Sequence, residues 1–354
     1  MIIDSFLFFQ ELDLLEIRLE YLYPFVDKFI IVEACQSFKG DLKPFNYEKN
    51  KERFSKYADK IIYFKIVDFH ESTYALFNYL KQSKNIERNF IYDLLLKHNF
   101  YDKNKINWLL DSYHRECIHL KLREICSDSD IVIISDLDEI PSLKVIEMVK
   151  NREIKIFPFV CNQIEFKYFL NSLSSKNWYG SIISPYSLIK ENSFNFMRHN
   201  CKNIYKLKNS GYHFTSVGGE KLLLNKIENW GHQEFNRGFI KRNLMQNVST
   251  GRDIFYRFGE NKNTIINLKN NNIFDSRISK IIKSYAHLLI SRNKKESTFE
   301  KIHYRYIQFI LYFIRLIEEP YKVIEKINFF LKNFFKIFII KALKNFIEMF
   351  LKYF

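Results

Sequence analysis

The feature that most constrains the fold of this chain is a series of short, continuously apolar runs separated by helix-length segments. The apolar runs of strand length cover residues 2–9, 27–34, 61–67 and 131–134. Residues 11–23 and 106–126 carry apolar side chains at helical spacing between these runs. Strands that alternate with helices, and that are apolar on both faces, favour an α/β domain with a mostly parallel sheet.

The second half of the chain has weaker periodicity and then changes character near residue 276. Residues 151–275 are rich in aromatics and turns, with strand-like runs at 154–160 and 179–184 and a helix expected over 220–230. In the last 28 residues, polar side chains (Lys, Asn and Glu348) recur every three to five positions among Phe and Ile. We therefore expect one domain over 1–275 and a basic amphipathic helical extension over 276–354, whose Lys face either binds anionic lipid or is solvated.

Composition excludes several classes of protein. The apolar fraction of 47% excludes a disordered chain, and the five cysteines contain no CxxC pair that would indicate a zinc module or disulfide framework. The N-terminus lacks the basic segment of a signal peptide, and no run of 18 apolar residues predicts a transmembrane helix. We expect a cytoplasmic protein in which the basic tail binds the inner face of the membrane.

The net charge of +15 suits nucleic acid, anionic lipid or phosphorylated substrates. No RNP, zinc-finger or helix-turn-helix signature accompanies it, so we expect no nucleic-acid partner. The chain also lacks GxSxG, HExxH, P-loop and GxGxxG motifs, which leaves serine hydrolase, zincin, P-loop kinase and Rossmann dehydrogenase functions without support.

The strongest candidate for chemistry is the acidic run 136–139 directly after the apolar strand 131–134. In an extended segment, residues two apart point to the same side, so Asp136 and Asp138 can share one divalent cation. Carboxylate oxygens suit Mg²⁺ or Mn²⁺, and such an ion commonly bridges carboxylates and a diphosphate. The alternative is a solvated acidic loop or a helix N-cap.

Other candidates for ligand binding lie at strand ends, on the helix before the acidic run, and in the most glycine-dense segment. Glu33 ends a strand and can accept hydrogen bonds from a ribose or base, while Arg115 suits a diphosphate. His213 can contact a metal or phosphate, and Gly218 and Gly219 permit close backbone approach. Each has an ordinary structural alternative as a capping acid, a surface Arg, a core His or a tight turn.

The segment WGHQEF adds a further pair of candidates. His232 can complete a metal shell, and Glu234 can act as a general base. Glu139 and Asp253 are the alternative bases, although Asp253 can equally form a salt bridge with Arg252 at a turn.

Four stretches of the chain, read together, resemble glycosyltransferase family 17, the family of β-1,4-mannosyl-glycoprotein 4-β-N-acetylglucosaminyltransferases. They span residues 4–40, 131–142, 211–236 and 251–257 in the family's order, and the first and third are long. His114 stands where a Gln is usual, and Tyr212 where a Trp is usual. The extension over 276–354 has no counterpart in the resemblance.

The resemblance implies a GT-A-like nucleotide-sugar-binding domain and inverting transfer from a nucleotide sugar, typically UDP-GlcNAc, to a sugar hydroxyl. It implies that Asp136 and Asp138 bind the metal with the diphosphate, and that Glu33 and Arg115 help to hold the nucleotide. The expected acceptor is a glycan or a lipid-linked saccharide at the membrane. The competing hypothesis is a non-catalytic glycan- or membrane-binding protein derived from such an enzyme.

Overall fold

A computed structural model describes residues 1–318 apart from 98, 100 and 270–271. It divides the chain into two compact units. The larger comprises Met1–Ile254 with Asn261–Lys294, and the smaller comprises Phe255–Glu260 with Lys295–Phe354. The first unit therefore continues past residue 275, where the sequence suggested a boundary.

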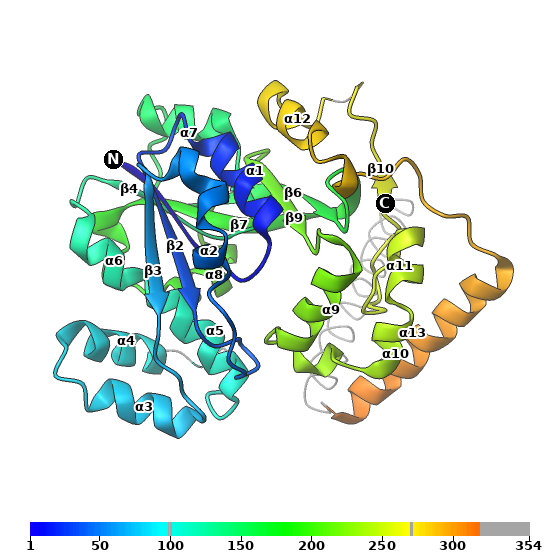
Figure 1. Cartoon of the computed structure of the whole chain (residues 1–354), viewed down its shortest axis with the longest axis horizontal. Helices are drawn as coiled ribbons and strands as arrows, with labels where there is room; N and C mark the ends of the chain where they lie inside the picture. Colours follow the sequence, from blue (N-terminus) through cyan, green and yellow to red (C-terminus); the bar gives the residue numbers. More distant parts are fainter. Residues whose placement is uncertain (98, 100, 270–271, 319–354) are drawn as a thin grey trace, which may run out of the picture. The chain divides into compact units, whose positions relative to one another are not determined.

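The larger unit is built on one mixed sheet, which confirms the α/β prediction (Figure 1). Its order is β3-β2-β1-β4-β7-β6-β9-β5, with β10 beside β7 and β8 beside β6. The strands are β1 (Ile2–Leu7), β2 (Lys28–Ala34), β3 (Ile61–Ile66), β4 (Ile131–Asp136), β5 (Glu139–Pro141), β6 (Phe159–Lys167), β7 (Ser172–Pro185), β8 (Tyr205–Leu207), β9 (Gly211–Thr215) and β10 (Thr264–Ile265).

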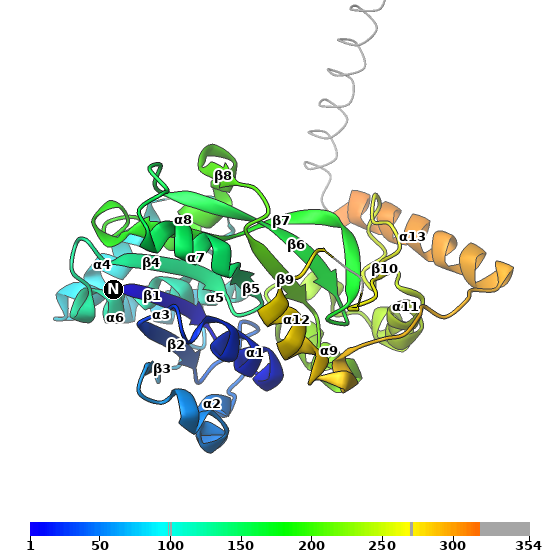
Figure 2. The ribbon, with the colours of Figure 1, turned by 90° about the horizontal axis from the view of Figure 1, so that it is seen from above.

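The four strands β3, β2, β1 and β4 are parallel, as the apolar runs predicted. The remaining part is mixed, because β7 pairs antiparallel with both β4 and β6, whereas β6 pairs parallel with β9. Figure 2 shows β6 and β7 running on beyond the parallel strands as a long ribbon.

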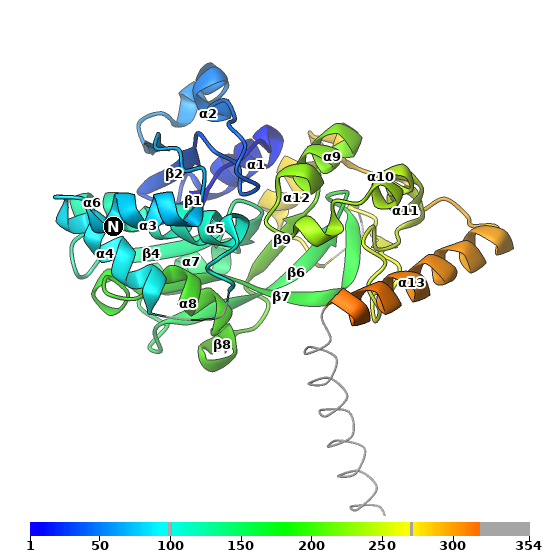
Figure 3. The same ribbon diagram turned by 90° about the horizontal axis from the view of Figure 1, so that it is seen from below.

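Helices cover both faces of the parallel strands. The helices longer than one turn in this unit are α1 (Leu12–Leu22), α3 (Thr73–Lys81), α4 (Ile86–Leu96), α5 (Ile106–Glu116), α6 (Ile118–Ile125), α7 (Leu143–Lys150), α8 (Phe194–His199), α9 (Gly219–Asn229), α10 (Gly238–Arg242), α11 (Leu244–Thr250) and α12 (Ser276–Lys283). The short α2 (Asn46–Lys49) follows β2. Helices α3 to α6 form one group (Figure 3).

Two apolar clusters, one on each face of the sheet, explain why the sequences of the parallel strands are continuously apolar. Along β4, Val132 and Ile134 pack with α3–α6 and α8, whereas Ile133 packs with α1, α7 and α12. Alternate residues of one strand thus enter opposite clusters, because both faces of the sheet are covered.

Two local features differ from the sequence-based expectations. The helix expected over 106–126 is two helices, α5 and α6, that meet at Cys117. The break lies beside Glu116, whose carboxylate accepts hydrogen bonds from the backbone N–H groups of Phe194 and Asn195. Helix α12 belongs to the larger unit because Asp275 caps it and hydrogen-bonds Tyr21.

The smaller unit contains α13 (Thr298–Glu318). Tyr256 stacks on Tyr304 with ring centroids 4.7 Å apart, and Gln308 donates a hydrogen bond to the carbonyl of Arg257. The amphipathic helix predicted for the last 28 residues lies outside the described residues. Within the described part of the chain, no helix is both long enough and apolar enough to cross a membrane.

Candidate functional site

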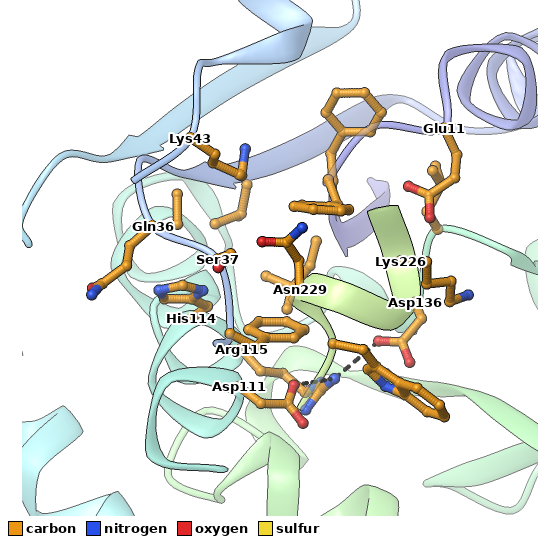
Figure 4. A pocket seen from close by; sticks show the side chains of 18 of the residues that line it. Glu11, Gln36, Ser37, Lys43, Asp111, His114, Arg115, Asp136, Lys226 and Asn229 are labelled. Carbon is orange, nitrogen blue, oxygen red and sulfur yellow. Dashed lines mark hydrogen bonds and ion pairs between the residues drawn. The ribbon is translucent and has the colours of Figure 1, made fainter. Parts of the chain in front are cut away.

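A pocket in the larger unit opens where β1, β2 and β4 end at their carboxyl termini (Figure 4). This edge is where parallel α/β sheets bind ligands. The pocket is lined by Leu7, Phe8, Phe9, Glu11, Val32, Ala34, Gln36, Ser37, Phe38, Lys43, Asp111, His114, Arg115, Asp136, Leu137, Asp138, Lys226, Asn229 and Trp230. The structure thus brings Arg115, Asp136 and Asp138 together, as the sequence predicted.

The acidic run forms a tight turn between β4 and β5. Strand β4 places Asp136 at its last position, and both Asp136 and Asp138 line the pocket. Glu139 instead points into the protein and is fully buried, where its Oε2 accepts a hydrogen bond from the Asp136 N–H at 2.9 Å. The side chain of Glu139 therefore stabilises the turn through a hydrogen bond to the backbone of Asp136.

Asp136 is held between two arginines. Arg115 Nη2 lies 3.1 Å from Oδ1, and Arg198 Nη2 on α8 lies 2.8 Å from Oδ2. Burial by itself raises the pKa of Asp136, but the charges of Arg198 and Arg115 outweigh burial and hold the pKa below its usual range. Asp136 consequently stays ionised and orders both guanidinium groups beside the pocket.

Asp138 has a different set of neighbours. Its Oδ2 lies 3.6 Å from His213 Nε2 on β9 and 3.8 Å from Lys226 Nζ on α9. Burial opposes ionisation of Asp138, but His213 and Lys226 lower its pKa. Burial lowers the pKa of His213, but Asp138 outweighs burial and raises it, so the two side chains form a loose ion pair. His213 would have to lose its proton before both groups could bind one cation.

The side chains around the acidic turn include possible ligands for the divalent cation that the sequence suggested. Within the described residues, no three His, Cys, Asp or Glu side chains converge as a complete metal site. Mg²⁺ and Mn²⁺ do not need one, since they are often held by one or two protein ligands with the remainder from phosphates and water. Asp138 and His213 fit that pattern, whereas both oxygens of Asp136 already accept from arginines.

The opposite wall of the pocket is mainly aromatic and uncharged, and the nearby Lys43 is paired with Glu33. His114 on α5 packs against Phe38 with ring centroids 5.5 Å apart, and Gln36 and Ser37 lie beside them (Figure 4). Burial lowers the pKa of His114 to about 3, so its ring is neutral at physiological pH. Ser37 Oγ is buried with no hydrogen-bond partner among the described residues. A planar, polar ligand would suit this wall.

Glu33 does not take the position that the sequence suggested. Its carboxylate turns to the segment after β2 and accepts hydrogen bonds from Lys43 Nζ, the Asn46 and Tyr47 backbone N–H groups and the Tyr63 hydroxyl. Val32 and Ala34, on the other face of the strand, line the pocket. The strand's alternation therefore points Glu33 away from the nucleoside position expected for it.

His232 is also placed apart from the two aspartates. Its Nδ1 pairs with Glu234 Oε1 at 2.7 Å, and its ring packs edge-on against Trp108. The imidazole that lies beside Asp138 is that of His213 rather than that of His232. His232 and Glu234 remain near the pocket because His232 also packs against Trp230, which lines it.

The three candidate bases occupy different environments. Glu234 is 44% exposed, so an acceptor can reach it. Glu139 is fully buried and accepts hydrogen bonds from Arg198 and Trp178 on both oxygens, which leaves it poorly placed to receive a proton. Asp253 is buried after α11.

Gly218 and Gly219 form the entry to α9 at positive φ angles of 130° and 81°. A Cβ on Gly218 would lie 2.4 Å from Leu222 Cδ1. The glycines therefore permit the turn that starts α9, and α9 in turn carries Lys226 and Asn229 to the pocket.

Sequence reasoning missed Lys226, Trp230, Arg198 and the neutral wall. Lys226 and Trp230 occur within the segment 211–236 that carries the resemblance, but no motif distinguishes them from surface residues. Arg198 is separated from Asp136 by 62 residues, and no local pattern marks it.

Comparison with known proteins finds a family match for the N-terminal part of this architecture. Residues 1–79, which include β1, α1, β2 and β3, match the model of glycosyltransferase family 17. No curated protein matches the chain. The mixed α/β sheet with its helices is consistent with a GT-A-like fold, and the match over residues 1–79 supports a member of glycosyltransferase family 17.

Proposed function

We propose that this glycosyltransferase is a metal-dependent inverting enzyme that transfers a sugar from a UDP-sugar to a hydroxyl of a glycan or lipid-linked saccharide. UDP-GlcNAc is the first donor to test, as the family resemblance implies. The observation that carries the proposal is the pocket at the strand ends, where a neutral aromatic wall faces a wall of paired charges.

The two walls suit the two halves of a nucleoside diphosphate. Phe38 and His114 offer ring faces to a base, and Ser37 offers a hydroxyl, whereas the amide of Gln36 already bonds the backbone of Gly40 and His70. Arg115 and Lys226 offer positive charge to the diphosphate, and a guanidinium matches phosphate geometry. His114 favours an uncharged base, because its own ring stays neutral.

Mn²⁺ or Mg²⁺ is proposed at Asp138 and His213, with Asp136 orienting Arg115 and Arg198 beside it. Such an ion, when bound, neutralises charge on the diphosphate leaving group. The chain's own part is to hold Asp138 ionised: Lys226 lowers the Asp138 pKa against the effect of burial, and His213 does so only while its ring is protonated and no ion is bound.

For the base we propose Glu234, which is the most accessible of the candidates and lies beyond Trp230 at the pocket. Inversion requires a general base that takes the proton of the acceptor hydroxyl while the hydroxyl oxygen bonds to the anomeric carbon and the bond from that carbon to the UDP oxygen breaks. His232 orients Glu234 through its hydrogen bond. Asp253 is the alternative, and Glu139 is disfavoured because arginine and tryptophan already bind it.

The acceptor and location are proposed from the sequence of the tail. We propose that residues 320–354, outside the described part of the chain, bind an anionic membrane surface at its cytoplasmic side through Lys with Phe and Ile in the lipid. Deleting 320–354 should move the protein from the membrane to the soluble fraction with an unchanged melting temperature. Unchanged partitioning would contradict lipid binding.

The test of the proposed function is a thermal-shift series with UDP, UDP-GlcNAc and other nucleotides, with and without MnCl₂, followed by measurement of UDP release. A ligand that binds only the native state raises the melting temperature. A shift with UDP that depends on Mn²⁺, together with UDP release, is expected. No shift with any nucleotide would favour the non-catalytic binding protein.

A further inference from the structure

Arg18 is a fully buried charged group next to the acidic turn, and the proposed chemistry does not use it. It lies on α1 with no solvent exposure, and its guanidinium sits 4.4 Å from the Phe6 ring centroid. Nε and Nη2 form a bidentate pair with Asp4 at 2.8 and 2.6 Å. Asp4 is equally buried, so this pair neutralises both charges.

The other donors of Arg18 reach the acidic turn. Nη1 lies 2.9, 3.0 and 2.9 Å from the backbone carbonyl oxygens of Asp136, Leu137 and Glu139, and Nη2 donates to Ser135 Oγ at 2.6 Å. Three carbonyls of one turn therefore converge on a single nitrogen, while the Asp136 and Asp138 side chains line the pocket.

The chemistry of the guanidinium explains why an arginine is needed here. Its five N–H donors lie in a fixed plane, so two can pair with Asp4 while the remainder stay aimed at the turn. A lysine ammonium can neutralise Asp4, but it is a single point and cannot also reach three carbonyls. The carbonyls of Asp136 and Leu137 would then lose this donor, whereas that of Glu139 would keep Ser181 Oγ, and the turn would have to rearrange.

We propose that Arg18, anchored by Asp4, is a positioning residue that sets the backbone of residues 135–139 and thereby aims Asp136 and Asp138 at the donor. This inference rests on the proposed function, because it assigns the turn to donor binding. Arg18 acts through the turn and touches no substrate. A displacement of about 1 Å in such a site is enough to reduce activity about a hundredfold.

The test compares Arg18→Lys with Ser135→Ala and with Leu80→Ala. Leu80 is fully buried on α3, in the cluster on the other face of the sheet from Arg18 and its neighbour Phe6, and serves as a control for lost stability. Two measurements are made on each full-length protein: amide hydrogen exchange over residues 135–139, and the affinity for UDP in the presence of MnCl₂.

Arg18→Lys is expected to speed exchange over 135–139 and to weaken UDP binding by about tenfold each, whereas Ser135→Ala, which loses one hydrogen bond, changes both by about threefold. Leu80→Ala should lower the melting temperature and leave both measurements as in the wild type. If Arg18→Lys does not fold, Ser135→Ala carries the test.

Three results would overturn the inference. Wild-type exchange and UDP affinity in both Arg18→Lys and Ser135→Ala would show that the turn does not depend on its hydrogen bonds with Arg18. Faster exchange with unchanged affinity would make Arg18 a stabilising residue alone, as would equal losses in Leu80→Ala. Failure of the wild type to bind UDP would instead remove the proposed function, and with it the role of the turn in donor binding. Amide exchange would still show whether Arg18 holds the backbone of residues 135–139.

Discussion

The two walls of the pocket differ in the charge state of their buried titratable side chains. On one wall, burial keeps His114 uncharged, and its pKa falls to about 3. On the other, burial of Asp136 and Asp138 is outweighed by Arg115, Arg198, Lys226 and His213, so both carboxylates stay charged. The difference shows that burial alone does not decide charge state; the number of opposite charges within reach decides it.

The walls also differ in how the chain builds them. The neutral wall comes from residues 36–38, just after β2, and from His114 on α5. The charged wall combines the β4–β5 turn with side chains from α5, α8, α9 and β9. Changes to the charged wall should therefore have the larger effects.

The largest effect is expected from Arg198→Ala. The change leaves buried Glu139 without its cation and Asp136 with one arginine instead of two. Removing one partner of a buried pair typically costs ~3 kcal/mol or more of unfolding free energy. Chemical denaturation should show this loss.

The matched control for Arg198→Ala is Arg53→Ala. Arg53 also pairs with two carboxylates, those of Asp13 and Glu16, but is 33% exposed. An exposed pair contributes at most ~1 kcal/mol. Equal losses for the two variants would break the distinction between a buried and a solvated charge network.

Asp138→Asn should reduce sugar transfer by about 10²–10³-fold, corresponding to ~3–4 kcal/mol of transition-state stabilisation. Asp138 has no short ion pair, so the melting temperature should change little. Asp136→Asn should lose activity and stability together, because Asp136 pairs with two arginines. Steady-state kinetics and thermal melts on both variants, with exposed Asp128→Asn as control, separate the two roles. Wild-type turnover by Asp138→Asn would refute its role in the site.

The His114→Gln variant tests the uncharged state of His114 through the pH dependence of the unfolding free energy. The folded-state pKa of His114 is about 3 against an ordinary value of 6.5, so between these values the unfolded chain binds the extra proton. Wild-type stability must then fall as pH decreases through that window, by up to ~1.4 kcal/mol per pH unit. The variant lacks this term and should gain ~2 kcal/mol relative to the wild type between pH 7.5 and 5.

Denaturation of both proteins over pH 4–8 checks this expectation. The difference between the two curves isolates His114 from the other titrating groups. Parallel curves would mean that the imidazole accepts a proton in the folded state, and that the neutral wall is not held neutral by burial.

The smallest effect is expected from Lys226→Met. Lys226 is partly exposed and lies 3.8 Å from Asp138, so its loss should weaken UDP binding about fivefold, or ~1 kcal/mol, with little change in stability. Lys221→Met, an exposed position on the same helix, is the matched control for lost charge. Calorimetric titration with UDP measures both; equal affinities for the two variants would place the diphosphate elsewhere.

The amino-acid sequence alone was sufficient to predict the parallel part of the sheet and the position of the acidic turn. Strands β1, β2, β3 and β4 and helix α1 occur within a residue or two of their expected ranges, because apolar periodicity is a property of neighbouring residues. It also placed Asp136, Asp138 and Arg115 at one edge of the sheet, since the ends of parallel strands meet there.

Which side chains surround the acidic turn could be seen only in the folded protein. The tertiary structure turned Glu33 away from the pocket, replaced His232 by His213 beside Asp138, and brought Arg198 and Arg18 to the acidic turn. Only one local feature of the sequence distinguishes Arg18: it is a charged residue within the apolar stripe of α1, between Leu15 and Leu22. These contacts join residues far apart in the chain, and their energies depend on burial and distance, which no spacing along the sequence encodes.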